Sequence, residues 1–133
     1  MIPSKLCAAL FLLPGLALSA QWNCRNQNLE VICSPEKCAA STSFTPMDVS
    51  ISHLGFVTIC AYSGCWEGKG KMLKSGAHLI ISANKLRWGG ASPNPASFII
   101  ALDKVDNVAV IKGANFAMPL ICTPRGQASG DGL

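Results

Sequence analysis

Two histidines, His53 and His78, are the residues of this 133-residue sequence best suited to acid–base chemistry near neutral pH. Either could act as a general base if the fold brought it beside an acid such as Glu67 or Asp103. Neither belongs to a metal-binding or nucleophile motif, and a turn or strand-end position accounts for both. The sequence therefore favours a binding protein over an enzyme, with a small hydrolase as an alternative.

Cysteine is the other residue type whose spacing is informative. Of seven cysteines, Cys7 lies in a leader-like N-terminal segment, and an even set of six follows: Cys24, Cys33, Cys38, Cys60, Cys65 and Cys122. Such a set in a small exported domain predicts disulfides. Two Cys-x4-Cys spacings enclose turn-like residues, which predicts Cys33–Cys38 and Cys60–Cys65 and leaves Cys24 for Cys122. The same pairing leaves no free thiol as a nucleophile and no zinc ligand set.

Cofactor and nucleotide motifs do not occur in the sequence. The Gly-Lys-Gly at 68–70 lacks the spacing of a phosphate-binding loop. Asp103 and Asp106 flank a predicted hairpin turn, where aspartates usually accept hydrogen bonds from their own backbone. We therefore expect no cofactor and no metal. The net charge of +4 is spread along the chain and does not predict a nucleic-acid partner.

The segment 61–74 concentrates aromatic and basic residues. Tyr62 and Trp66 lie near the Cys65 turn, and Lys69, Lys71 and Lys74 follow among glycines. Lys69 and Lys71 would share one face of a strand and could meet an anionic polysaccharide, lipid headgroup or acidic protein. Exposed Tyr and Trp side chains favour binding surfaces, whereas a core Trp and edge-protecting lysines are the competing interpretation.

A second candidate is the stretch Ser75-Gly76-Ala77-His78, followed later by Trp88. It is locally similar to the motif of the membrane-bound and periplasmic inhibitors of c-type lysozyme, which are small exported β-barrels. In that motif a Tyr follows the Ser-Gly-Ala stretch, whereas this chain has Leu79, and its six-cysteine pattern also differs. The resemblance covers about a tenth of the chain and implies that Ser75, Gly76 and Ala77 would face an enzyme cleft.

The elements that must position these residues are almost all strands. Period-two alternation at 29–33 and 49–52 predicts half-buried strands, and the run 55–62 predicts a strand buried on both faces. Further strands are expected at 77–82, 97–103, 108–112 and 115–122, where Pro119 suggests an edge position or a bulge. Residues 34–46 and 89–95 are expected to be loops, the first with a possible helical turn. About eight short strands predict an all-β antiparallel barrel or sandwich.

The two ends of the chain differ from this pattern. Residues 1–20 have the charge, apolar run and small residues of a secretory signal, with cleavage after Ser19 or Ala20. The apolar run is too short for a spanning helix, so we expect no membrane span after cleavage. We predict one β domain at 21–122 and a disordered tail at 123–133.

These observations predict a secreted or periplasmic, disulfide-stabilised β domain that binds an anionic envelope component or a protein partner. The lysozyme-inhibitor-like protein is the first alternative and the small hydrolase is the second.

Overall fold

The structure is a computed structural model that describes residues 22–89 and 95–124. Its described strands are β1 (Trp22–Arg25), β2 (Glu30–Cys33), β3 (Cys38–Ser41), β4 (Asp48–Ile51), β5 (Phe56–Ala61), β6 (Gly64–Lys69), β7 (Lys71–Ser75), β8 (His78–Trp88), β9 (Ala96–Asp103), β10 (Val108–Gly113) and β11 (Phe116–Pro124). No helix in the described ranges has the length and apolar composition needed to cross a membrane.

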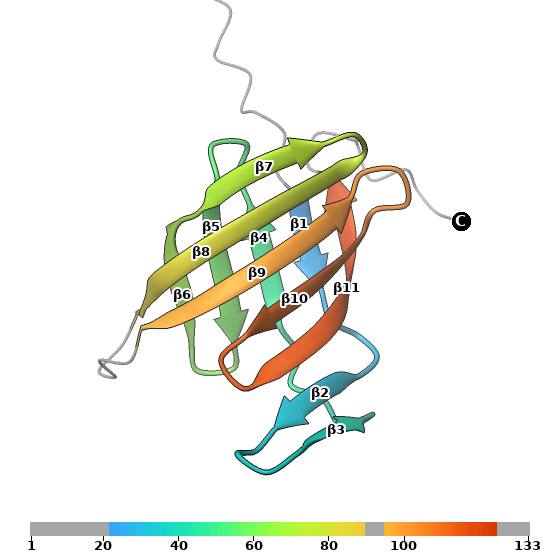
Figure 1. Ribbon diagram of the computed structural model, residues 1–133, viewed down its shortest axis with the longest axis vertical. Helices are drawn as coiled ribbons and strands as arrows, with labels where there is room; N and C mark the ends of the chain where they lie inside the picture. The colour runs from blue at the N-terminus through green and yellow to red at the C-terminus, as the bar shows by residue number, and fades with distance from the viewer. Residues whose placement is uncertain (1–21, 90–94, 125–133) are drawn as a thin grey trace, which may run out of the picture.

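Eight of these strands close into an antiparallel barrel, as Figure 1 shows. The ring runs β1-β4-β5-β6-β8-β9-β10-β11, and β11 pairs with β1 to complete it. The predicted all-β barrel is therefore confirmed. Two further pieces lie outside the ring: the β2–β3 hairpin extends from β11, and β7 pairs only with β8.

The barrel interior is filled by every second side chain of its strands. This inward set is apolar and fully or almost fully buried: Val49, Ile51, Val57, Ile59, Leu79, Ile81, Phe98, Ile100, Leu102, Ile111, Met118 and Leu120. A barrel of eight strands is just wide enough for side chains to fill it. The alternation seen in the sequence follows from this arrangement, because each strand has one face toward the core and one toward solvent.

That geometry corrects the prediction for the run 55–62. Val57 and Ile59 of β5 are buried, but Phe56 on the opposite face is exposed. The residues of this run are apolar on both faces of the strand, but a strand in a barrel wall buries only the face that points into the barrel. The prediction for residues 34–46 was wrong at β3, which pairs with β2 along its whole length.

All three predicted disulfides are present, and each joins residues directly opposite each other on paired strands. Cys24–Cys122 links β1 to β11, Cys33–Cys38 links β2 to β3, and Cys60–Cys65 links β5 to β6. The first of these bonds crosses the strand pair that closes the barrel. Three disulfides fit a protein of an oxidising extracellular or periplasmic compartment.

The last strand continues further than expected. Thr123 and Pro124 belong to β11 and pair with Asn23 and Trp22. Pro119 lies where β11 has a partner on one side only, because β2 pairs at Phe116 and Ala117 and β1 pairs from Ile121 onward. A proline is tolerated there because it removes no ladder hydrogen bond on the open side. The predicted signal, the tail beyond 124 and most of the 89–95 loop lie outside the described residues.

Candidate functional site

One end of the barrel gathers three turns and the start of β1. The turns are the β4–β5 turn at 52–55, the β7–β8 turn at 76–77 and the β9–β10 turn at 104–107. The Lys104 N–H donates to the Ala77 carbonyl oxygen at 2.9 Å, which joins two of the turns. We call this the basic end, because Lys69, Lys71, Lys74 and Lys104 lie on or beside it.

The position of β7 opens this end of the barrel. β6 and β7 are separated by Gly70, whose N–H donates to the Gly55 carbonyl oxygen at 2.8 Å. Beyond Gly70 the chain pairs only with β8, so the β4–β5 turn and β7 are no longer joined by a ladder. Gly55 has a φ of +87°, and a Cβ there would lie 2.9 Å from the Gly70 oxygen. The glycine therefore allows the close approach from which β7 diverges.

A cavity of about 140 Å³ lies where β7 diverges. It is lined by residues from five parts of the fold: Trp22, His53, Met72, Lys74, Leu79 and Lys104. A cavity of about this volume can hold a group the size of a benzene ring. Its walls are mostly apolar, and the two lysines provide positive charge.

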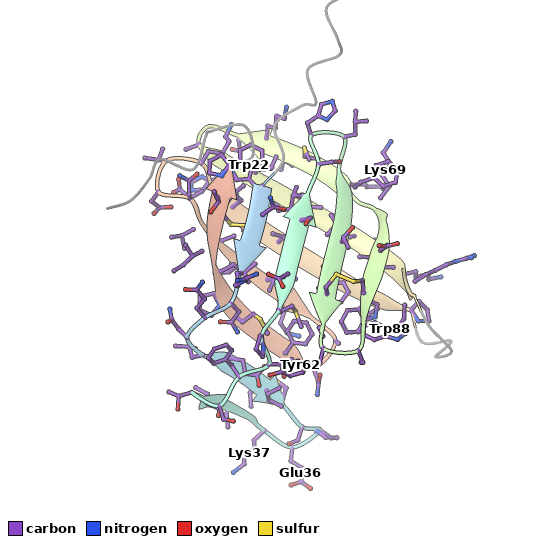
Figure 2. The ribbon with its side chains drawn as sticks, turned by 180° about the vertical axis from the view of Figure 1, so that it is seen from behind. Trp22, Glu36, Lys37, Tyr62, Lys69 and Trp88 are labelled. Carbon is purple, nitrogen blue, oxygen red and sulfur yellow. A yellow bond between two sulfur atoms is a disulfide. The ribbon has the colours of Figure 1, made fainter. Side chains whose placement is uncertain are left out.

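Trp22, which lines this cavity, carries a buried hydrogen-bond donor without a partner. Its indole Nε1 is buried and has no hydrogen-bond partner among the described residues. A buried N–H without a partner costs about 1–3 kcal/mol, so buried indole N–H groups are usually paired. Figure 2 shows Trp22 at the same end of the barrel as Lys69 and far from Lys37. The cavity thus combines an apolar lining with two lysines, and one of its lining residues carries a buried N–H without a partner.

The three lysines predicted to bind an anionic partner do not all point to the same side of their strands. A Cβ at Gly70 would lie 2.7 Å from Ile81 Cγ2, so position 70 points into the barrel and its neighbours Lys69 and Lys71 point outward. Lys74 has the opposite parity from Lys71 and lines the cavity together with Met72. Only Lys74 of the three therefore contributes to the cavity, and the other two add charge outside it.

The aromatic part of the 61–74 segment lies elsewhere. Tyr62 is in the β5–β6 turn at the opposite end of the barrel and is 80% exposed (Figure 2). Trp66 packs against Trp88 and Phe98, with ring centroids 4.3 and 5.3 Å away. These contacts support the core interpretation of Trp66. Tyr62 and the lysines do not form one surface, because β6 runs from the Tyr62 turn at one end of the barrel to Lys69 at the other.

The Ser75, Gly76 and Ala77 residues of the lysozyme-inhibitor-like motif form the turn between β7 and β8. Ser75 and Gly76 are exposed, and Gly76 has a φ of +57°. Leu79, at the position of the motif's Tyr, is buried in the barrel at 2% exposure. The turn is therefore accessible at the basic end, while the fifth position of the motif belongs to the core.

The residues of the hydrolase hypothesis partly converge. Ser75 lies opposite His78, and His78 lies opposite Asp103, in one row across β7, β8 and β9. His78 Nε2 is 3.5 Å from Asp103 Oδ2, and no hydrogen bond joins Ser75 to His78 in the described ranges. The other Asp103 oxygen accepts the Val105 N–H at 2.8 Å. Asp103 thus shapes the β9–β10 turn, and the row lacks the serine–histidine hydrogen bond that activates a nucleophile. Glu67 lies opposite Thr58 and Arg87, away from both histidines.

Sequence reasoning missed four cavity residues: Trp22, Met72, Leu79 and Lys104. A signal existed for Lys104, which lies between the two predicted turn aspartates. The sequence contains no comparable signal for Trp22 and Met72, because only the closure of the barrel brings these two residues to the same cavity. Among the described residues, no group of three or more His, Cys, Asp or Glu side chains is placed to hold a metal ion.

Comparison with known proteins adds no further constraint on this site. The sequence matches no protein-family model, no curated protein and no solved structure.

Proposed function

We propose that the protein is an exported binding module and that its basic end takes a small anionic group joined to an apolar moiety. The observation that carries this proposal is an apolar cavity bordered by Lys74 and Lys104, whose lining residue Trp22 also carries a buried, unpartnered Nε1. The two ammonium groups would balance the charge of the ligand, and a turn of the Trp22 side chain would let an acceptor oxygen of the ligand satisfy the indole N–H. Export is supported by the signal-like N-terminus and the three disulfides.

Calorimetry with benzoate and phenyl phosphate tests this proposal, with benzyl alcohol as the uncharged comparison. The ring matches the cavity volume, and the anion supplies the acceptor oxygens. We expect both anions to bind and the alcohol to bind more weakly. Trp22→Phe, which keeps an aromatic ring and removes the donor, should weaken anion binding about tenfold.

The charge requirement is tested with two double variants, each of which removes two lysine charges. Lys74→Gln with Lys104→Gln should weaken anion binding about tenfold, since each lost charge-assisted contact contributes about 0.5–1 kcal/mol at a partly exposed site. The control, Lys37→Gln with Lys112→Gln, alters exposed lysines that do not line the cavity. Equal losses in both pairs, or equal binding of the uncharged alcohol, would contradict the proposal.

Inhibition of c-type lysozyme is the second candidate function, favoured by the exposed 75–77 turn beside Lys74 and His78. The cleft of a glycosidase contains two carboxyl groups, which suits a turn that follows the Lys74 ammonium group. We expect inhibition of lysozyme activity that Ser75→Glu abolishes through repulsion between carboxylates. The matched control is Ser63→Glu in the exposed β5–β6 turn at the other end of the barrel. Absence of inhibition by the unaltered protein would eliminate this candidate.

A further inference from the structure

We propose that the basic end docks on the surface of a phospholipid bilayer that carries anionic lipids. Leu54 and Val105 enter the interface, and the surrounding lysines contact the headgroup phosphates. This inference rests on the proposed function and names the partner of the same end of the molecule.

The first observation is a pair of apolar side chains at the tips of two turns. Leu54 in the β4–β5 turn is 60% exposed, and Val105 in the β9–β10 turn is 80% exposed. Their sequence neighbours His53 and Lys104 both line the cavity, so the two turns lie side by side around its mouth. Two exposed aliphatic groups bordering one basic surface are the chemistry of an interfacial anchor.

Local hydrogen bonds hold both turns in these conformations. In the β4–β5 turn, the Gly55 N–H donates to the Ser52 carbonyl oxygen at 3.1 Å, and the Phe56 N–H donates to Ser52 Oγ at 2.9 Å. In the β9–β10 turn, the Val105 and Val108 N–H groups donate to the carboxylates of Asp103 and Asp106 at 2.8 and 3.1 Å. The apolar tips are therefore fixed before any partner arrives, which lowers the ordering cost of binding.

The charges at this end are complementary to an anionic surface. Lys69, Lys71, Lys74 and Lys104 are at or beside it and have no salt-bridge partner in the described part of the chain. The nearby carboxylates Asp103 and Asp106 accept N–H groups of their own turn and keep their charge, so the four lysines leave an excess of positive charge at this end. Each basic side chain near an anionic bilayer contributes about 1 kcal/mol, which corresponds to about fivefold in affinity.

The combination favours a bilayer over an acidic protein surface. At a bilayer, acyl chains lie directly beneath the phosphates, so apolar tips and lysines at one end of a protein are satisfied together. An acidic protein surface would pair the lysines but would place Leu54 and Val105 against charged groups. The cavity opens at the same end, between the two turns that carry the apolar tips.

Vesicle co-sedimentation tests this inference with the oxidised, exported form of the protein. The vesicles are pure phosphatidylcholine, or phosphatidylcholine containing a third of phosphatidylglycerol. We expect binding to the anionic vesicles that weakens with added salt and little binding to the neutral ones. Leu54→Ser with Val105→Ser should reduce partitioning at least about tenfold, because two aliphatic groups no longer leave water.

The matched control is Ile99→Ser with Val110→Ser. These residues are similarly exposed on the outer face of β9 and β10, away from the cavity mouth. Equal losses in the two double variants, or equal binding to neutral and anionic vesicles, would overturn the inference. No vesicle binding by a protein that still binds phenyl phosphate would overturn the bilayer partner alone and leave the proposed function standing. Loss of both activities would overturn both.

Discussion

Gly113 shows how strictly the barrel interior specifies a single residue. It lies opposite Phe98 in the register between β10 and β9, and the Phe98 ring occupies the space that a side chain at 113 would need. Gly113→Ala should therefore lower the free energy of unfolding by about 1–3 kcal/mol through overpacking. Urea denaturation of the oxidised protein measures this change.

The neighbouring Lys112→Ala is the control, since Lys112 is exposed on the same strand. It should change stability by no more than about 0.5 kcal/mol. A similar loss of stability in both variants would show that the cause is the pairing of β10 with its neighbours and not the contact with Phe98.

The sequence directed attention to part of the candidate site. Lys74 was expected from local composition and the 75–77 turn from the resemblance to lysozyme inhibitors, and the structure places both at one end of the barrel. Trp22 and Val105 were not expected, since their roles depend on barrel closure and on which turns lie at the same end. Tyr62 was expected beside the lysines because it is close in sequence, but β6 runs from its turn to the opposite end of the barrel.

At the scale of elements, hydrophobic alternation located most barrel strands, because each has one inward face. It failed where the surroundings differ from a barrel wall. At β2, Glu30 is 5% exposed while Ile32 and the preceding Leu29 are exposed, since this strand lies outside the ring and pairs with β11 at only two residues. The sequence analysis also did not predict β7 as a separate strand. The point where β7 diverges from β6 depends on a contact between Gly55 and Gly70, which lie 15 residues apart in sequence.

At the scale of the whole molecule, the Cys24–Cys122 bond joins residues 98 positions apart on the two strands that close the barrel. Replacing both cysteines with Ala should lower stability by about 4–5 kcal/mol in the loop-entropy model. Replacing Cys60 and Cys65, which are 5 positions apart, should cost about 2 kcal/mol. Thermal unfolding under non-reducing conditions compares the two variants, and equal shifts in Tm would argue against a special role for barrel closure.

The same bond determines how the molecule responds to a pulling force. Trp22 and Pro124 are paired at the open ends of β1 and β11, so tension applied to the two ends of the described chain would break the hydrogen bonds of this strand pair one after another. Strand separation would reach the Cys24–Cys122 disulfide after two residues. While that disulfide is intact, the load passes from one strand to the other through a covalent bond, and the entire chain between the two cysteines carries no tension. A reductant would remove this bypass and expose the barrel to the full force.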